Sequence, residues 1–121
     1  MMKFYKCKNS NEIIIKIKEN ESCCMNDNFI EINANTCDAS KEKHIPVVSF
    51  SNNLMNICIG SDLHPMVKEH FIDWVFIEYP NGGEFIYLHN EPNVVVSLVG
   101  REVKRVYAYC NQHGLWVREL N

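Results

Sequence analysis

The stretch FIDWVFIEYPNGGEFIYL, residues 71–88, indicates the fold class of this chain. Its two runs are rich in aromatic and β-branched residues, which favour strands. They are separated by PNGG, residues 80–83, a composition that favours a tight turn. In the first run Ile72, Trp74 and Phe76 occupy alternate positions, so we expect them to share one face of a strand. The stretch therefore predicts a β-hairpin.

Similar short apolar runs recur along the chain, at residues 54–59, 93–99 and 103–109. In the first of these runs, LMNICI, we expect Met55, Ile57 and Ile59 to face the core. No segment shows a long helical period. Five or more short strands at this spacing predict an all-β fold, arranged as a β-sandwich.

The N-terminal part has a pattern of its own. In NEIIIKIK, residues 11–18, the side chains of Ile13, Ile15 and Ile17 alternate, which predicts a half-buried strand. The stretch from 19 to 40 that follows is rich in Asn, Ser and Cys, and we interpret it as a boundary. We therefore expect a small N-terminal domain over residues 1–36 and a sandwich domain over residues 37–121.

Composition excludes several classes of function. The 121 residues include 12 Lys and Arg against 15 Asp and Glu, a formal net charge of -3 that argues against nucleic-acid binding. The start MMKFYKCKNS lacks the apolar core of a signal peptide, and no run approaches the roughly 18 apolar residues of a membrane span. We therefore expect a cytoplasmic protein without a membrane partner. Six cysteines in a reducing compartment indicate metal ligands or packed thiols rather than disulfides.

The segment YCNQHGLW, residues 109–116, sets Cys110 and His113 three positions apart. Such a turn can bring a sulfur and a nitrogen to one metal ion, while the backbone N–H groups of Gln112 and His113 hydrogen-bond the sulfur. The alternative is a buried cysteine beside a surface histidine. A metal site would need further ligands upstream.

Upstream histidines are available between the predicted strands. His44 lies in KEKHIP, and His64 and His70 lie in GSDLHPMVKEHFIDW, where we expect Pro65 to open a short helical turn that carries His70 back toward His64. Loops on a rigid scaffold commonly carry such sites. Three further residues are interpreted as structural or surface groups: Cys37, Cys58 and His89.

Three segments carry a family resemblance: KEKHIP, GSDLHPMVKEHFIDW and YCNQHGLW. In this order and spacing, they resemble the active-site segments of the superoxide reductases, the desulfoferrodoxin and neelaredoxin family. The resemblance runs from about Asn35 to Trp116. It implies an immunoglobulin-like β-sandwich that holds one mononuclear non-haem iron, Fe2+/Fe3+. The implied ligands are four equatorial imidazoles and one axial thiolate, from His44, His64, His70, His113 and Cys110.

The resemblance also implies a function: one-electron reduction of superoxide to hydrogen peroxide, in defence against oxidative stress. It suggests rubredoxin or a similar small protein as electron donor, and a homodimer or homotetramer. It assigns Lys43 to guiding superoxide and Glu42 to the sixth iron position once the iron is ferric. The alternative for this KEK segment is an ordinary solvated charge run.

The N-terminal segments YKCKNSNE and ESCCMND resemble a desulforedoxin-like domain, whose iron is held by four thiolates. Cys7, Cys23 and Cys24 match three of those positions, but the fourth is Ser10. A hydroxyl supports a soft tetrahedral site poorly. We therefore expect this site to be empty or weakly zinc-binding, and we favour its loss over substitution by Cys37.

Two non-enzymatic functions are alternatives. A blue-copper electron carrier would place a weak axial Met after the second His, and no Met follows His113. A structural zinc module needs four closed tetrahedral ligands, whereas five are available here.

Overall fold

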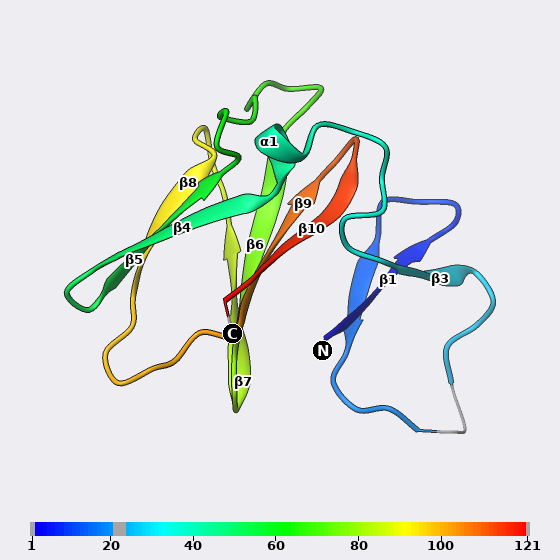
Figure 1. Ribbon diagram of the computed structural model, residues 1–121. Helices are drawn as coiled ribbons and strands as arrows, with labels where there is room; N and C mark the ends of the chain where they lie inside the picture. Colours follow the sequence, from blue (N-terminus) through cyan, green and yellow to red (C-terminus); the bar gives the residue numbers. More distant parts are fainter. Residues whose placement is uncertain (1, 21–23, 121) are drawn as a thin grey trace. The chain divides into compact units, whose positions relative to one another are not determined.

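The computed structural model describes residues 2–20 and 24–120. These residues form antiparallel β-sheets and one short helix, α1 (Lys41–His44), which confirms the predicted all-β class (Figure 1). The described part of the chain contains no helix long and apolar enough to cross a membrane. The chain divides into two compact units, Met1–Asn33 and Ala34–Asn121.

The first unit is a three-stranded sheet in the order β2-β1-β3. Its strands are β1 (Lys3–Cys7), β2 (Ile13–Lys16) and β3 (Phe29–Ile32). The central strand places Phe4 between Ile15 of β2 and Ile32 of β3. The predicted β2 is present, but it ends at Lys16, and Ile17 is 91% exposed. The expectation that Ile17 faces the interior is therefore wrong, because the strand ends before reaching it.

The second unit consists of two sheets. The four-stranded sheet, in the order β10-β9-β6-β7, contains β6 (Ile72–Tyr79), β7 (Gly82–Tyr87), β9 (Arg105–Cys110) and β10 (Gly114–Glu119). The three-stranded sheet, in the order β4-β5-β8, contains β4 (Pro46–Ser51), β5 (Leu54–Ile59) and β8 (Asn93–Ser97). The predicted hairpin is confirmed, with β6 and β7 paired from Trp74↔Tyr87 to Tyr79↔Gly82.

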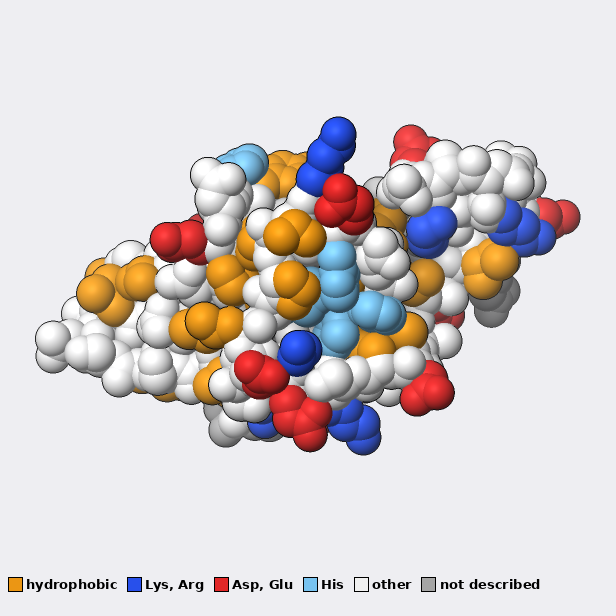
Figure 2. Space-filling view, turned by 90° about the horizontal axis from the view of Figure 1, so that it is seen from above, with side chains coloured by type: hydrophobic (Ala, Val, Ile, Leu, Met, Phe, Trp, Pro, Cys, Tyr) orange, Lys and Arg blue, Asp and Glu red, His pale blue; other side chains and the backbone are white. Residues whose placement is uncertain are grey.

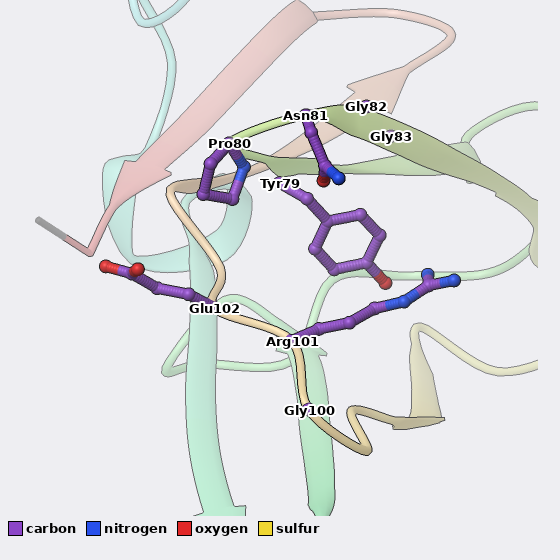
Figure 3. Close-up of a pocket in the computed structure, with 8 residues that line it drawn as sticks. All are labelled: Tyr79, Pro80, Asn81, Gly82, Gly83, Gly100, Arg101 and Glu102. Carbon is purple, nitrogen blue, oxygen red and sulfur yellow. The ribbon is translucent and has the colours of Figure 1, made fainter.

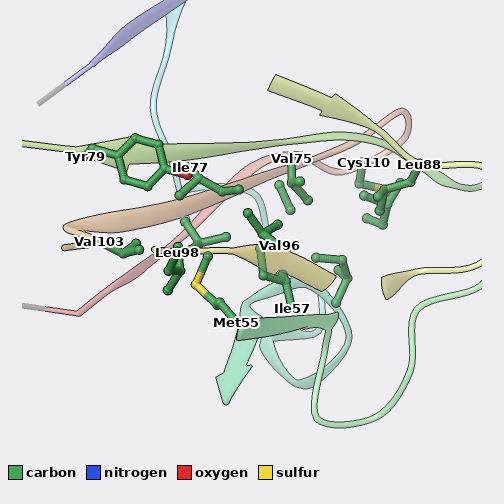
Figure 4. Close-up of a cluster of buried hydrophobic side chains, with 14 residues drawn as sticks. Met55, Ile57, Val75, Ile77, Tyr79, Leu88, Val96, Leu98, Val103 and Cys110 are labelled. Atoms are coloured by element: carbon green, nitrogen blue, oxygen red, sulfur yellow. The ribbon is translucent and has the colours of Figure 1, made fainter. Parts of the chain in front are cut away.

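The core lies between the two sheets of this unit (Figure 4). Met55, Ile57 and Ile59 are fully buried, as predicted from their alternation. They pack in one cluster with Val75 and Ile77 of the opposite sheet. Because burying such side chains contributes roughly 1.5–3 kcal/mol each, this cluster forms a rigid base for the loops at the ends of the sheets.

A β-bulge changes the pattern of β6. The pairing with β9 shifts between Ile72↔Cys110 and Trp74↔Tyr109, so that an extra residue stands in β6. Alternation therefore restarts after the bulge, and Val75 joins Ile72 in the core cluster. The expectation that Ile72 shares one face with Trp74 and Phe76 is wrong, because a bulge moves the following side chains to the other face.

The second unit begins with a strap along β10. The Asn35 side chain accepts a hydrogen bond from the Val117 N–H at 2.9 Å, and its backbone N–H donates to the Leu115 carbonyl at 2.9 Å. Asn35 has a positive φ of 61°, a conformation that asparagine tolerates well. This strap attaches the segment that leads to α1 to the sandwich.

Candidate metal centre

The predicted ligands gather at one end of the sandwich. His44 ends α1, and His64 and His70 lie in the connection between β5 and β6. Cys110 ends β9, and His113 lies in the turn before β10. Figure 2 shows a compact group of histidine side chains visible at the surface near α1. The β6–β7 hairpin turn lies at the opposite end of the sandwich (Figure 1).

The four imidazole rings form a closed circuit. Ring centroids are 4.7 Å apart for His44 and His64, and 4.5 Å apart for His64 and His70. The circuit is completed by 4.9 Å from His70 to His113 and 4.9 Å from His113 to His44. The separation across it, from His44 to His70, is 6.3 Å. Four near-equal sides and a longer diagonal describe a square of imidazoles.

Hydrogen bonds fix the tautomers of two of these rings. The Nδ1–H of His44 donates to the Ser40 carbonyl, and the Nδ1–H of His64 donates to the Pro65 carbonyl at 2.7 Å. The Nε2 lone pair of each ring is thereby available for a metal ion. Burial lowers the pKa of His44 and lowers that of His64 to about 4, so both rings are neutral near pH 7.

Two ring nitrogens of the cluster are buried without a partner. Within the described residues, the Nε2 atoms of His64 and His70 are the buried side-chain nitrogens or oxygens that lack a hydrogen bond. Leaving such an atom unsatisfied costs about 1–3 kcal/mol. The Nε2 atom of His44 lies 3.1 Å from the Nδ1 atom of His113, close to the spacing of adjacent donors at ~2.1 Å from one ion. These nitrogens fit a metal ion.

Cys110 supplies the sulfur of the cluster and is fully buried. Its Sγ atom accepts a hydrogen bond from the His113 N–H at 3.3 Å, as the spacing predicts. Burial raises the pKa of the Cys110 thiol, while the N–H groups of Gln112 and His113 oppose that rise. A bound cation would deprotonate such a thiol and be held by it.

The ligand atoms of His44, His64, His70 and Cys110 lie within 4.8 Å of one another and can hold a metal ion. His113 completes the circuit of rings beside them. Imidazole nitrogens with one thiolate suit a transition metal rather than Ca2+ or Mg2+.

Trp116 supports one ring and one turn of the cluster, and it was not selected from the sequence as a site residue. Its indole stacks on His44 with a centroid distance of 4.7 Å and an interplanar angle of 22°. Its Nε1–H donates to the His113 carbonyl at 3.1 Å. A fully buried tryptophan therefore sets the orientation of His44 and the path of the His113 turn.

Gly60 brings α1 against the histidine loop, a second contribution that the sequence did not indicate. Its φ is +87°, and an added Cβ would lie 2.6 Å from the carbonyl oxygens of both Glu42 and Asp62. The Asp62 N–H donates to that Glu42 carbonyl at 3.0 Å. A residue with a side chain would separate the two ligand-bearing segments.

The route from His64 to His70 differs from the prediction. No helical turn follows Pro65. Instead Val67 and His70 form an isolated antiparallel bridge, with N–H···O distances of 3.1 and 3.2 Å. The predicted helical turn is wrong. The Pro65 carbonyl accepts a hydrogen bond from the His64 side chain instead of from a helical N–H, and the chain then reverses at the Val67–His70 bridge.

The two charged residues beside His44 are both exposed. The Lys43 ammonium lies 3.9 Å from the Asp62 carboxylate. Burial is the main cause that lowers the pKa values of His44 and His70, and the Lys43 charge adds a smaller contribution in the same direction. The Glu42 carboxylate accepts a hydrogen bond from the Ser40 hydroxyl at 2.8 Å. Its own N–H and the Ser40 hydroxyl lower the pKa of Glu42. The charge of Lys43 therefore lies close enough to affect the rings, whereas the Glu42 carboxylate is hydrogen-bonded to Ser40 at the start of α1.

The N-terminal cysteines are only partly visible. A hydrogen bond from the Ser10 hydroxyl is the main cause that lowers the pKa of Cys7, so these two predicted positions are adjacent. Cys24 is exposed. Cys23 lies outside the described residues. The three residues interpreted as structural or surface groups are distributed as follows: Cys37 and His89 are exposed, and Cys58 is half-buried.

A separate hollow of about 650 Å³ lies beside the β6–β7 turn (Figure 3). Arg101 lies over the Tyr79 ring at 4.7 Å and faces the Glu84 carboxylate at 3.9 Å. The residues that line it include neither histidine nor cysteine. Of its two charged lining residues, Arg101 and Glu102, the former is paired with Glu84. The histidine cluster, which gathers side chains able to hold a metal ion, is the better functional site.

Comparison with known proteins shows which family this chain resembles. The desulfoferrodoxin family model matches residues 36–119. A desulfoferrodoxin of Clostridium acetobutylicum is 31% identical over 121 residues, which cover 98% of this chain and 97% of that protein. A desulfoferrodoxin of Syntrophotalea carbinolica is 35% identical over 124 residues, with 98% and 96% covered.

A solved structure shows the same relationship. The crystal structure of the superoxide reductase from Treponema pallidum superposes with a TM-score of 0.82 and 28% identity, covering 98% of this chain and 99% of that one. The family model matches most of the chain, and the relatives match nearly all of it. This chain belongs to the desulfoferrodoxin family.

Proposed function

We propose that this protein is a superoxide reductase, which reduces superoxide by one electron to hydrogen peroxide at a mononuclear iron. The iron would be held by the imidazoles of His44, His64, His70 and His113 and by the Cys110 thiolate. The observation that carries the proposal is the square of four imidazoles beside a buried thiol. Family membership, together with the superoxide reductase of Treponema pallidum at 28% identity, supports the same activity.

Iron fits these donors better than the two alternatives. A structural zinc ion takes four tetrahedral ligands, whereas a square of imidazoles and a thiol offers five. Blue copper takes two histidines and one cysteine in a trigonal plane with a weak axial ligand. A six-coordinate ferrous ion accepts all five donors and keeps one position for a small anion.

When bound, ferrous iron would supply the electron and one coordination position, and the superoxide anion would gain one electron and two protons to become hydrogen peroxide. The chain's own residues prepare this step. The Cys110 thiolate increases the electron density at the site, and the N–H of His113 moderates it through the hydrogen bond at 3.3 Å. The half-exposed His70 and His113 leave this face accessible to solvent, the source of protons.

Lys43 is proposed to attract superoxide to the open face. The chain is net negative, so the attraction must come from a local positive charge. Its position supports this role, because the Lys43 side chain is half-exposed and directly precedes His44 in the chain. Glu42 is proposed to approach the sixth position once the iron is ferric. It would first leave the Ser40 hydroxyl.

The surroundings of the reaction are proposed from the family resemblance. The enzyme would work in the cytoplasm, as a homodimer or homotetramer, and receive electrons from rubredoxin or a similar small donor. We propose that the unit Ala34–Asn121, which contains the expected sandwich domain over residues 37–121, is catalytic, and that the unit Met1–Asn33 is a desulforedoxin-like domain without its iron. Electrons would then enter directly at the exposed catalytic centre.

Metal analysis and superoxide pulses test the proposal. Protein purified without oxygen should contain about one iron per chain, and each pulse of superoxide should yield hydrogen peroxide without dioxygen. Dioxygen evolved in proportion to the superoxide consumed would indicate dismutation instead. A zinc-filled site with no reaction would support the structural alternative. A ferric-thiolate band in the visible spectrum of the oxidised protein would exclude zinc.

A further inference from the structure

The loop that carries His70 is joined to the turn after β9 by two side chains that the proposed reaction does not use. The Nδ2 amide of Asn111 donates to the Glu69 carbonyl at 3.0 Å. The Nε2 amide of Gln112 donates to the same carbonyl oxygen at 2.7 Å. The residue immediately before His70 is therefore held by two neutral donors.

The residue immediately after His70 is held as well. The Phe71 N–H donates to the Oδ1 atom of Asn111 at 2.8 Å. The Asn111 N–H donates to the Phe71 carbonyl at 3.1 Å. Asn111 thus contacts the backbone on both sides of His70, and its side chain uses both its donor and its acceptor to do so.

His70 depends on this support more than the other rings do. The Nδ1 atoms of His44 and His64 donate to backbone carbonyls. His113 lies in the turn that Trp116 braces. Among the residues that the structure describes, the Nε2 atom of His70 is buried and has no hydrogen-bond partner. The orientation of this ring therefore rests on its backbone and on its neighbouring rings.

We propose that Asn111 and Gln112 are positioning residues that hold the His70 imidazole in the square of ligands. The two residues between Cys110 and His113 would thereby join the turn and the His70 loop into one ligand unit. We call the hydrogen bonds from Asn111 and Gln112 to the backbone around His70 the clamp. The proposal rests on the metal centre of the proposed function, but the clamp is present in the metal-free protein. It can therefore be tested separately.

Substitutions at Gln112 separate a hydrogen bond from a charge effect. Gln112→Lys keeps a donor that can reach the Glu69 carbonyl, whereas Gln112→Glu places a carboxylate against that oxygen. The clamp predicts Co2+ affinity close to wild type for Gln112→Lys and a loss of about tenfold for Gln112→Glu. Electrostatics alone predicts the reverse order, because an added carboxylate attracts a cation and an added ammonium repels it.

Asn111→Ala removes both side-chain bonds, and Asn81→Ala at the exposed β6–β7 turn is its matched control. Asn111→Ala should lower Co2+ affinity by about 10- to 100-fold. In the metal-free protein, it should also accelerate hydrogen exchange of the Phe71 amide by at least about tenfold, while the Val75 amide in β6 keeps its protection. Asn81→Ala should change neither quantity.

Two results would overturn the clamp: a Phe71 amide that exchanges at the wild-type rate in Asn111→Ala, or Co2+ affinities that follow charge at position 112. A general loss of Val75 protection would also count against it, since that reports destabilisation rather than positioning. If wild-type protein binds Co2+ but fails to reduce superoxide, the proposed function fails while the clamp stands on the exchange and affinity data. If no metal binds, Phe71 exchange alone decides the clamp.

Discussion

The backbone N–H of His113 donates to the Cys110 sulfur at 3.3 Å, and the Nδ1 atom of the same histidine lies 3.8 Å from that sulfur. One residue therefore acts twice in the proposed site, because its amide hydrogen-bonds the sulfur and its ring holds a proposed ligand nitrogen. Gly114 follows with a φ of +80°, which lets the turn enter β10 directly. Such a turn fixes the sulfur and the nitrogen relative to each other before any metal binds.

Replacing the sulfur tests its proposed axial role. Cys110→Ser should abolish superoxide reduction and remove the thiolate-to-iron absorption band of the oxidised protein, because a hydroxyl is a much weaker anionic donor than a thiol. The half-buried Cys58 on β5 provides the matched control, and Cys58→Ser should retain both properties. Activity that survives Cys110→Ser would contradict the axial assignment.

Gly60→Ala should damage the site through its geometry. An added Cβ would lie 2.6 Å from two backbone carbonyl oxygens, and the φ of +87° is unfavourable for alanine. We expect a loss of about 2–4 kcal/mol in the free energy of unfolding, measured by urea denaturation, together with weaker metal binding. Gly82→Ala, where an added Cβ meets nothing within 4 Å, is the control. Equal stability of the two variants would show that α1 can shift without cost.

Much of this arrangement could be predicted from the sequence. Two runs of strand-favouring residues on either side of residues 80–83 predicted the β6–β7 hairpin, and the pattern of Met55, Ile57 and Ile59 predicted the core face of β5. These features depend on local patterns, and the structure confirms both. The resemblance of three short segments also selected five residues that lie together at one end of the sandwich.

The remaining features depend on pairing between distant segments. The bulge in β6 follows from its register with β9, which no single strand reveals. The stacking of Trp116 on His44 joins positions 72 residues apart, and Gly60 matters only because α1 lies against it. β3 escaped prediction because its four residues lie in a polar stretch and pair with β1.

Charges beside the site should control the encounter with superoxide. Lys43→Ala should slow the second-order reaction by about two- to tenfold at low ionic strength and weaken its salt dependence, because an attractive charge is lost. Asp62→Asn should accelerate it, since the carboxylate 3.9 Å from Lys43 opposes the same field. Pulse radiolysis over a range of salt concentrations measures both effects.

Lys68→Ala removes an exposed lysine from the connection between β5 and β6 and serves as the control for net charge. A rate for Lys68→Ala as low as that for Lys43→Ala would indicate that only the total charge matters. Glu42→Ala should leave the encounter rate nearly intact and change the spectrum of the ferric protein. If it slows the encounter as much as Lys43→Ala, the proposed division of roles is wrong.

The buried histidines should make the metal-free protein sensitive to acid. Burial lowers the pKa of His64 from its ordinary value of 6.5 to about 4, so the unfolded chain binds a proton between these values while the folded chain does not. The free energy of unfolding should therefore fall as the pH drops from about 6.5 to 4, by at most about 1.4 kcal/mol per pH unit for this residue. His44 and His70, whose pKa values are also lowered, add to the effect.

Urea denaturation of the metal-free protein across this pH range measures the slope. His64→Gln should reduce it, and the exposed His89→Gln should leave it unchanged. A slope that His64→Gln does not alter would mean that His64 is protonated equally in both states.

Ser10→Cys should create a second metal centre in the N-terminal unit. The Ser10 hydroxyl lies close enough to Cys7 to be the main cause that lowers the pKa of its thiol, so a thiol at position 10 would lie beside the Cys7 sulfur. Cys7 ends β1, and Ser10 lies in the turn that joins β1 to β2. This turn is closed by the Cys7 N–H, which donates to the Glu12 carbonyl at 3.0 Å. With Cys23 and Cys24 this gives the four sulfur donors that a tetrahedral zinc or iron site requires.

The Ser10→Cys variant should bind about one more metal ion per chain, with intense thiolate-to-metal absorption when the ion is ferric. Ser10→Ala should bind none at this position. A second thiolate-bound iron in the unmodified protein would show that the site was never lost, and a Ser10→Cys variant without extra metal would show that the four sulfurs do not converge.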